Sequence, residues 1–209
     1  MGYSNADHPN YAPLLYDPVA SKGRRFTSLP AAKVERMYHS SATLIPDGRV
    51  LVSGSNPNPD VTDQRYATQY RVELLTPPYM ALERPTFSGA PSNLVWGRSY
   101  LLSVTIPANT RWIQATLVQP GFATHSLSMN QRYVELETDR LAGDTQVRIH
   151  APAHTGIFPP SPALLFILAD AVPSEGLFLM VGPGDAPPFD QSALDSMLRQ
   201  TQLHPVHDY

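Results

Sequence analysis

Residues 42–54 read Ala-Thr-Leu-Ile-Pro-Asp-Gly-Arg-Val-Leu-Val-Ser-Gly, and this stretch is the strongest local indication of the fold. Two runs of strand-forming residues, Ala42–Ile45 and Arg49–Val52, flank the tripeptide Pro46-Asp47-Gly48. Because proline presets the φ of a turn and glycine accepts a positive φ, the pattern predicts a β-hairpin. A third run at residues 70–75 alternates apolar and polar side chains. Three short antiparallel strands of this kind are typical of one blade of a β-propeller.

Further strands are expected on the N-terminal side of this blade. Residues 12–18 and 25–30 resemble the outer two strands of a preceding blade, so residues 1–83 are interpreted as the C-terminal blades of a propeller. A propeller closes by repeating typically four or more blades around an axis, and a single blade leaves its edges exposed. We therefore expect the chain to be a fragment, a truncated gene product, or one that completes its propeller on a partner.

The composition favours an all-β protein and excludes several classes of function. Proline, which is found mainly at turns and strand ends, makes up 22 of the 209 residues, about twice its usual share. The 15 Lys and Arg residues against 18 Asp and Glu give a net charge of −3, which argues against nucleic-acid binding. No apolar run approaches the roughly 18 residues of a membrane-spanning helix. Cysteine is absent, so disulfides and thiolate chemistry are excluded.

Residues 84–182 have the pattern of a second domain. Evenly spaced runs of β-forming residues with turn residues between them predict an immunoglobulin-like β-sandwich, without the disulfide of antibody domains. Beyond it, residues 183–209 are expected to form a Pro/Gly linker, a short helix that begins near Asp190, and a tail without periodicity. The predicted strands of the sandwich cover residues 86–90, 100–106, 113–118, 127–136, 146–150, 164–168 and 177–181.

Histidine and tyrosine are the candidate metal ligands of this cysteine-free chain. Tyr38-His39 lies at the start of the first blade strand, and His125 is predicted on a loop between two sandwich strands. Each can be an ordinary polar residue, but the two segments can also meet at a domain interface, where imidazole nitrogens and a phenolate oxygen suit Cu(II). His150 and His154 have a helical spacing, but the Ala-Pro-Ala between them forbids a regular helix. The other histidines, His8, His204 and His207, lie near the chain ends and are expected to be exposed.

Several longer motifs follow one another along the chain. Residues 36–58 read Arg-Met-Tyr-His-Ser-Ser-Ala-Thr-Leu-Ile-Pro-Asp-Gly-Arg-Val-Leu-Val-Ser-Gly-Ser-Asn-Pro-Asn. After them come Tyr-Arg-Val-Glu-Leu-Leu-Thr-Pro-Pro-Tyr (70–79), Arg-Pro-Thr (84–86), Pro-Gly-Phe-Ala-Thr-His-Ser (120–126), Asn-Gln-Arg (130–132) and Val-Pro-Ser (172–174). In this order the motifs resemble the C-terminal portion of the copper-radical oxidases, the family of glyoxal oxidase and galactose oxidase. The segment Ser-Gly-Ser-Asn-Pro-Asn from Ser53 onward is more similar to glyoxal oxidase than to galactose oxidase.

The resemblance implies a kelch-like propeller followed by an early-set immunoglobulin-like domain, one loop of which reaches the propeller axis to complete a copper site. It implies that Tyr38 is the axial tyrosine and general base, and that His39 and His125 are the two equatorial ligands. It implies oxidation of an aldehyde or a primary alcohol by two electrons, one taken by Cu(II) and one by a tyrosyl radical, with reduction of O2 to hydrogen peroxide. An extracellular location is implied as well, although residues 1–8 lack the features of a signal peptide.

Two departures from the family pattern limit the expected activity. The radical tyrosine of the family is cross-linked to a cysteine, and this chain has none, so an incomplete copper site and an inactive chain are expected. Residues 159–166, which lead into the penultimate sandwich strand, also differ in sequence from the family's pattern at that place. Two hypotheses follow. The chain is the C-terminal part of an oxidase for glyoxal, methylglyoxal or a primary alcohol. Alternatively, it is a non-catalytic sandwich module that binds a carbohydrate or a protein, or a truncated pseudoenzyme.

Overall fold

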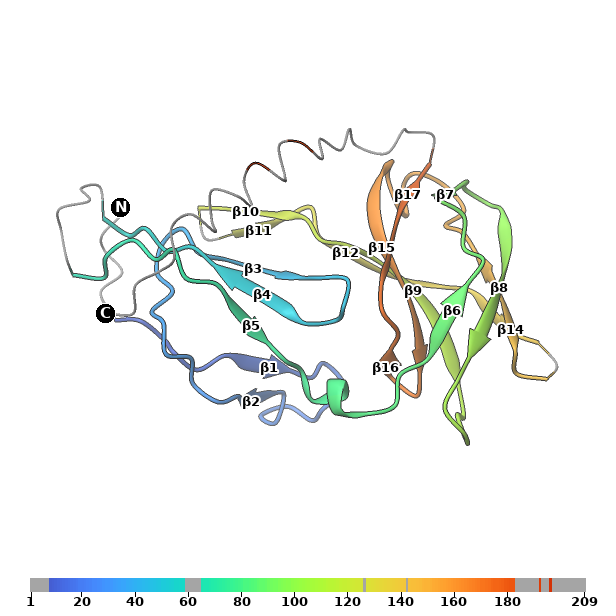
Figure 1. Cartoon of the computed structure of the whole chain (residues 1–209), viewed down its shortest axis with the longest axis horizontal. Helices are drawn as coiled ribbons and strands as arrows, with labels where there is room; N and C mark the ends of the chain where they lie inside the picture. The colour runs from blue at the N-terminus through green and yellow to red at the C-terminus, as the bar shows by residue number, and fades with distance from the viewer. Residues whose placement is uncertain are drawn as a thin grey trace.

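The computed structural model describes residues 8–58, 65–125, 127–141, 143–182, 192 and 196. Within them the chain is built almost entirely of β-strands and loops, and the 3-10 turn η1 (Pro78–Ala81) joins two regions (Figure 1). The N-terminal region, residues 8–79, carries small sheets, and the sandwich, residues 84–182, has two larger ones. The all-β prediction is confirmed. In the described part of the chain, no helix has the length and apolar character needed to span a membrane.

The small sheets of the N-terminal region are antiparallel, as predicted for propeller blades. One is the hairpin of β1 and β2, and the other follows the order β3-β4-β5. Strand β5 is shorter than the run predicted at residues 70–75, because its pairing with β4 begins at Glu73. The bounds are Leu14–Tyr16 (β1), Phe26–Ser28 (β2), Ser41–Leu44 (β3), Val50–Ser53 (β4) and Glu73–Leu75 (β5).

The turn between β3 and β4 closes as its sequence predicts. Ile45 N donates to Arg49 O at 3.0 Å, and Gly48 N donates to Ile45 O at 2.9 Å. Gly48 has a φ of 93°, a left-handed value that glycine adopts without steric cost. The Asp47 carboxylate accepts hydrogen bonds from Arg49 N at 2.8 Å and from Arg49 Nε at 2.7 Å. The predicted hairpin is therefore confirmed, and its turn is tied by side-chain as well as main-chain contacts.

The sandwich consists of two β-sheets that share one core. The first has the order β12-β9-β15-β17-β7, with β16 paired to β15, and the second has the order β13-β14-β8-β6 (Figure 1). Strand β17 pairs with β7 in parallel. The first sheet contains Asn93–Leu94 (β7), Ile113–Gln119 (β9), Arg132–Leu136 (β12), Ser161–Ala169 (β15), Val172–Pro173 (β16) and Leu177–Val181 (β17); the second contains Thr86–Ser88 (β6), Ser99–Thr105 (β8), Thr138–Arg140 (β13) and Gln146–His150 (β14).

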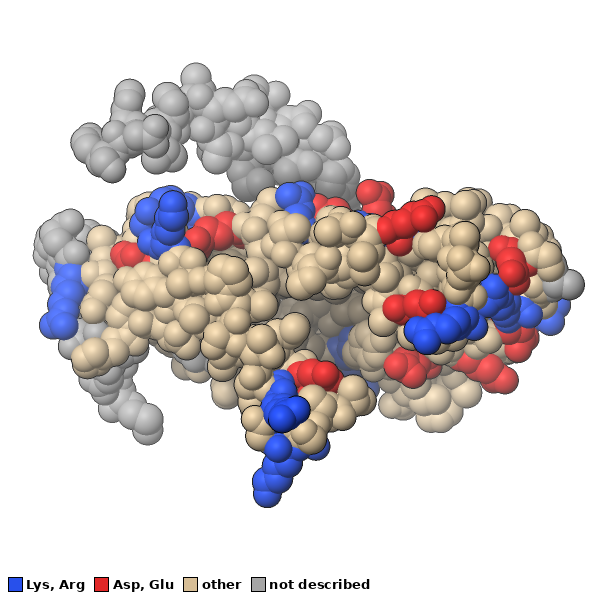
Figure 2. Space-filling model, turned by 90° about the horizontal axis from the view of Figure 1, so that it is seen from below, with Lys and Arg blue, Asp and Glu red and all other residues tan. Residues whose placement is uncertain are grey.

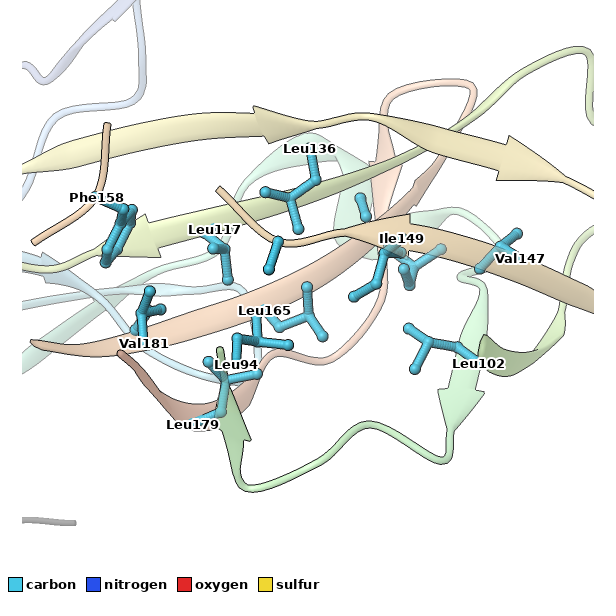
Figure 3. Packing of buried hydrophobic residues seen from close by; sticks show 14 of the residues in the cluster. Leu94, Leu102, Leu117, Leu136, Val147, Ile149, Phe158, Leu165, Leu179 and Val181 are labelled. Carbon is cyan, nitrogen blue, oxygen red and sulfur yellow. The ribbon is translucent and has the colours of Figure 1, made fainter. Parts of the chain in front are cut away.

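One hydrophobic cluster fills the space between the two sheets (Figure 3). Leu102 of β8 and Ile149 of β14 belong to it together with Leu117 of β9 and Leu165 of β15, and all four side chains are fully buried. Strand β15 is buried without interruption over residues 163–167, as expected of a central strand. Because burial of apolar surface is the main favourable contribution to folding, this cluster gives the sandwich a core of its own.

One predicted strand of the sandwich is divided, and the division creates the hairpin that bears His125. The run at residues 127–136 forms β11 (Leu127–Met129) and β12, because Asn130 takes a left-handed φ of 58° between them. Strand β11 pairs with β10 (Phe122–Thr124). The β10–β11 hairpin extends from β9 and β12 toward the N-terminal region, so that it leaves the body of the sandwich (Figure 1).

The proline-rich segment before the penultimate strand changes local pairing and leaves the fold intact. Strand β15 begins at Ser161, and Pro162 pairs with Met180 of β17. Pairing of β15 with β9 begins two residues later, at Leu164. Pro162 therefore lies where β15 has its partner strand on one side, which is where a residue without an N–H group is tolerated.

The remaining differences concern short elements and the C-terminal residues. Strands β7, β10, β13 and β16 contain two or three residues each, too few for an alternating pattern to be visible in the sequence. The linker, helix and tail predicted at residues 183–209 lie outside the described residues, apart from Ser192 and Ser196. They stay predictions.

Candidate metal centre

Tyr38 and His39 lie in a turn just before β3, held by the loop that follows β4. Asn56 N donates to Tyr38 O at 2.7 Å, and Met37 N donates to Ser55 Oγ at 2.8 Å. His39 has a φ of 130°, which a residue with a side chain adopts only at a steric cost. The two residues therefore belong to a fixed turn, and the strand itself begins after them at Ser41.

Gly54 and Arg36 support this turn from two sides. A Cβ atom at Gly54 would approach His39 O to 2.6 Å, so only glycine fits there without a shift of the backbone. The Arg36 guanidinium donates to Gly54 O at 2.7 Å and to Arg71 O at 2.9 Å, and it forms an ion pair with Glu73 at 3.0 Å. The Arg36 side chain is only 10% exposed. Its contacts with Glu73 and Gly54 are partly buried, so the loss of one partner would leave a partly buried group without its hydrogen bond.

His125 occupies the tip of the β10–β11 hairpin, as predicted for a loop residue. It is exposed, and its φ of 51° lies in the left-handed region. Its Nδ1 lies 2.8 Å from Thr124 Oγ1. With Nδ1 engaged in this way, Nε2 is the ring nitrogen suited to a metal. At the base of the hairpin, a Cβ atom on Gly121 would lie 2.3 Å from Met129 O, so the close approach of the two strands requires glycine.

Tyr38 and the β10–β11 hairpin border the same cavity, which has a volume of about 730 Å³. The rings of Tyr38 and His39 pack together with centroids 3.9 Å apart. Tyr38 is half-buried, and His39 is exposed. The structure thus brings Tyr38 to the hairpin. His39 and His125 are not lining residues: His39 follows Tyr38 directly, and His125 lies two positions from the lining residues Ala123 and Leu127. The lining includes Tyr38, Ser41, Phe122, Ala123, Leu127 and Gln131.

The other histidines have different roles. His150 lies 3.1 Å from Asp139 Oδ2 through Nε2 and 3.0 Å from Ser99 Oγ through Nδ1. His154 Nδ1 accepts from Gly156 N at 3.1 Å. His8 is exposed, as predicted, and it lines the same cavity as Tyr38, whereas His204 and His207 lie outside the described residues. No local pattern marks His8, because its position depends on how the N-terminal residues pack across the cavity.

Charged groups of both signs are intermixed on the face shown in Figure 2. Ion pairs of the sandwich include Arg140 with Asp144 at 2.7 Å and Arg148 with Asp139 at 3.8 Å. On the coloured part of this face, the Lys and Arg residues lie beside Asp and Glu residues and do not gather in one area. Such a surface produces no strong field of one sign to steer a charged partner.

Comparison with known families identifies both regions. Residues 1–79 match the family described as Glyoxal oxidase N-terminus, and residues 84–181 match the family described as Galactose oxidase-like, Early set domain. Together these matches support a likeness to the copper-radical oxidases in both regions of the chain. The resemblance drawn from the motifs is confirmed, and the early-set match falls on the residues that form the sandwich.

Individual copper-radical oxidases show how much of such a protein the chain covers. It is 34% identical over 194 residues to the aldehyde oxidase GLOX1 of Arabidopsis thaliana, across 86% of this chain and 32% of that protein. It is 29% identical over 175 residues to a galactose oxidase of Gibberella zeae, across 79% of this chain and 24% of that protein. The chain therefore spans about a third or less of these relatives' length.

A solved structure has the same fold. It is described as a novel fungal alcohol oxidase with catalytic diversity among the AA5 family, in complex with copper. The TM-score is 0.69 at 21% sequence identity, and the match covers 88% of this chain and 38% of the other. At this identity the likeness establishes the fold.

The donor atoms of the candidate site suit copper. Tyr38 offers a phenolic oxygen, and His39 and His125 offer imidazole nitrogens, a mixture of N and O donors that is typical of tetragonal Cu(II). Within the described ranges, no three His, Cys, Asp or Glu side chains lie close enough together to hold a metal ion. By the types of their donor atoms, Tyr38, His39 and His125 suit a copper(II) ion.

Proposed function

We propose that this chain supplies the tyrosine and the two histidines of the copper site of an aldehyde or primary-alcohol oxidase. The observation that carries the proposal is the cavity shared by Tyr38 and the hairpin that bears His125. Aldehydes of the glyoxal and methylglyoxal type are the first candidate substrates, since two relatives at 34% identity are named aldehyde oxidases. The reaction removes two electrons and two protons from the substrate and transfers them to O2, which becomes hydrogen peroxide.

The residues of this chain have distinct roles in that reaction. Bound copper would supply a one-electron acceptor beside the substrate. Tyr38 borders the cavity, and its phenolic oxygen would take the proton of the substrate hydroxyl group, which for an aldehyde is a hydroxyl of its hydrate. His39 and His125 would hold the metal from two segments whose backbones are fixed in left-handed conformations. Ligands held in this way need little rearrangement when the metal changes its oxidation state.

A second one-electron acceptor is needed, and this chain does not contain the cross-linked Tyr-Cys group because it has no cysteine. We expect no hydrogen peroxide from the purified chain with Cu(II), O2 and either glyoxal or methylglyoxal. A peroxidase-coupled assay measures this directly. Sustained turnover would overturn the account of the missing acceptor.

The copper ligands are tested by binding and not by activity. His125→Ala is expected to weaken Cu(II) binding by about 10- to 100-fold, the range typical when a metal site loses part of its support. His154→Ala is the matched control, because His154 contacts its own turn through Gly156 N. Isothermal titration calorimetry and the electron paramagnetic resonance (EPR) spectrum of bound Cu(II) give the affinity and the donor set. Equal effects of the two substitutions would remove His125 from the site.

The second acceptor is proposed to come from a further propeller portion that packs on the N-terminal region. Leu14, Phe26, Tyr70 and Val72 expose between 55% and 85% of their side chains there, and their burial against a partner would be favourable. The mass of the native protein, recovered from its source with an antibody against the sandwich, decides this point. A mass several-fold above 23.0 kDa supports the oxidase. A free chain of 23.0 kDa overturns it in favour of a non-catalytic sandwich module.

A further inference from the structure

Three consecutive main-chain carbonyl groups in the turn between β3 and β4 accept hydrogen bonds from donors outside the turn. We name this set of contacts the turn clamp. Its donors lie at the end of the N-terminal region, at the start of the sandwich and near β17, so it ties the blade hairpin to the sandwich. The contacts are Gly176 N to Pro46 O (2.7 Å), Arg84 Nη1 to Asp47 O (2.7 Å) and the Tyr79 hydroxyl to Gly48 O.

Arg84 is the central residue of the clamp because it binds both regions at once. Besides Asp47 O, its guanidinium donates from Nε to Pro173 O at 2.7 Å and from Nη2 to Ser174 O at 2.5 Å. Ser174 is fully buried, and its hydroxyl accepts from Ile167 N at 3.0 Å, so the carbonyl that it presents to Arg84 is held in place. A planar guanidinium that donates to three carbonyls fixes direction as well as distance.

Two hollows that are open to solvent lie along the same interface. A cavity of about 250 Å³ is bordered by Leu44 of the blade and Phe166 of the sandwich. Another, of about 290 Å³, is bordered by Val50 and Arg132. Side chains that border solvent-open hollows lack the close-packed neighbours of a protein interior, so packing determines the relative position of these regions less tightly than it would in a continuous core. The polar contacts of the clamp supply the missing constraint.

The clamp lies at one end of the strands that lead to the candidate copper ligands. Strand β3 runs back from the clamped turn to Tyr38 and His39, and β9 runs forward to Pro120 and the hairpin that bears His125. A rotation of the turn relative to the sandwich therefore changes the separation of the two ligand segments. We propose that Arg84 is a positioning residue that sets the copper-site geometry by fixing the blade hairpin on the sandwich, an inference that rests on the proposed function.

The first experiment measures copper binding by the whole chain with and without the clamp. Arg84→Ala is expected to weaken Cu(II) binding about 10- to 100-fold, the loss typical when a residue that positions a metal ligand is removed. It should also change the EPR spectrum of the bound Cu(II). Arg84→Lys should retain part of the affinity, since it keeps the charge and loses the planar fork. Arg140→Ala is the control, because the Arg140 guanidinium donates to Thr110 O at 2.8 Å and pairs with Asp144 inside the sandwich. It should leave affinity and spectrum unchanged.

The second experiment measures the position of the two regions without copper. The chain has no cysteine, so spin labels can be attached at Val72→Cys and Ser103→Cys, two exposed positions on the blade and on the sandwich. Arg84→Ala should broaden the distance distribution between the labels, and Tyr79→Phe, which removes one contact of the clamp, should broaden it less. Tyr79→Phe also serves if Arg84→Ala does not fold.

The two experiments separate this inference from the proposed function. If the parent chain fails to bind copper, the proposed ligand set is wrong, and the label distances still decide whether Arg84 holds the two regions together. If the parent chain binds copper and Arg84→Ala leaves the affinity, the EPR spectrum and the label distances unchanged, the positioning role is overturned and the ligand set stands. A broadened distance with unaltered copper binding also overturns the role of Arg84 at the site.

Discussion

The two regions of this molecule are stabilised in different ways. In the described part of the chain, the buried hydrophobic residues lie in the sandwich except for Val34, Met37 and Pro57. The N-terminal region relies instead on polar contacts, in particular the Arg36 ion pair with Glu73 and the turn clamp around Arg84. A core resists distortion through many weak contacts, whereas a polar network depends on a few strong, directional ones. The candidate copper site combines one ligand segment from the N-terminal region with one from the sandwich.

The largest effect is expected from a cavity in the sandwich core. Leu165→Ala should lower the free energy of unfolding by about 2–5 kcal/mol, because Leu165 is fully buried between the sheets. Leu74→Ala is the matched change in the blade, where Leu74 is 43% exposed, and it should cost less than about 1 kcal/mol. Urea unfolding followed by tryptophan fluorescence and circular dichroism measures both. Similar losses would show that the two regions do not differ in this way.

A smaller and more local effect is expected from Arg36→Ala. It leaves Glu73 and two main-chain carbonyls without their charged donor and should destabilise the N-terminal region by about 2–3 kcal/mol. Hydrogen exchange should show faster opening of the amides of β3 and β4, with the sandwich unchanged. Arg111→Ala is the control, since Arg111 is 82% exposed in its pair with Asp170 and should cost less than about 1 kcal/mol. Faster exchange throughout the chain would contradict the local role.

The smallest effect is expected from the turn carboxylate and depends on pH. Hydrogen bonds from Arg49 hold the pKa of Asp47 below its ordinary value of 3.8. Because the pKa is lowered in the folded state, the ionised carboxylate stabilises the fold above pH 3.8, and this contribution disappears as the pH falls through the lowered value. Asp47→Asn should therefore make the N-terminal region slightly less stable at neutral pH and less sensitive to acid. Carboxyl NMR titration and hydrogen exchange at two pH values measure the two parts of this prediction.

Asp144→Asn is the corresponding substitution in the sandwich. The Arg140 side chain lowers the pKa of Asp144 in the same direction. This substitution should alter acid sensitivity near β13 and β14 and leave the blade as it is. A pKa of Asp47 at or above 3.8 in the folded chain would refute the proposed contribution of the turn.

Local sequence features predicted the parts of the fold that depend on neighbouring residues. The Pro46-Asp47-Gly48 turn was predicted because proline and glycine restrict the backbone directly. Strands of five or more residues, such as β8, β9 and β14, were located because alternation needs that length to be visible. The division at Asn130 was missed, since residues 127–136 have strand character on both sides of it and asparagine enters the left-handed region without a clear sequence signal.

For the candidate site as well, the sequence identified individual residues but not their contacts in space. Tyr38, His39 and His125 were singled out from the motifs, but the cavity that joins Tyr38 to the β10–β11 hairpin, and the presence of His8 in its lining, appear only in the folded chain. Arg84 and residues 172–174 were noted as separate motifs. Arg84 binds Pro173 O and Ser174 O, which follow it in the chain by 89 and 90 positions, and no local pattern specifies such contacts.

By itself, the sequence determined the all-β class, the blade hairpin, the division into blade and sandwich, and the residue types that a copper site needs. Turns, alternation and donor chemistry are properties of single residues or of a few adjacent ones, so they can be inferred from the sequence directly. Only the tertiary structure decided which of those residues share a cavity and which carbonyl groups Arg84 binds. Those contacts join segments that are distant in the chain, and their geometry depends on how the whole core and its interface pack.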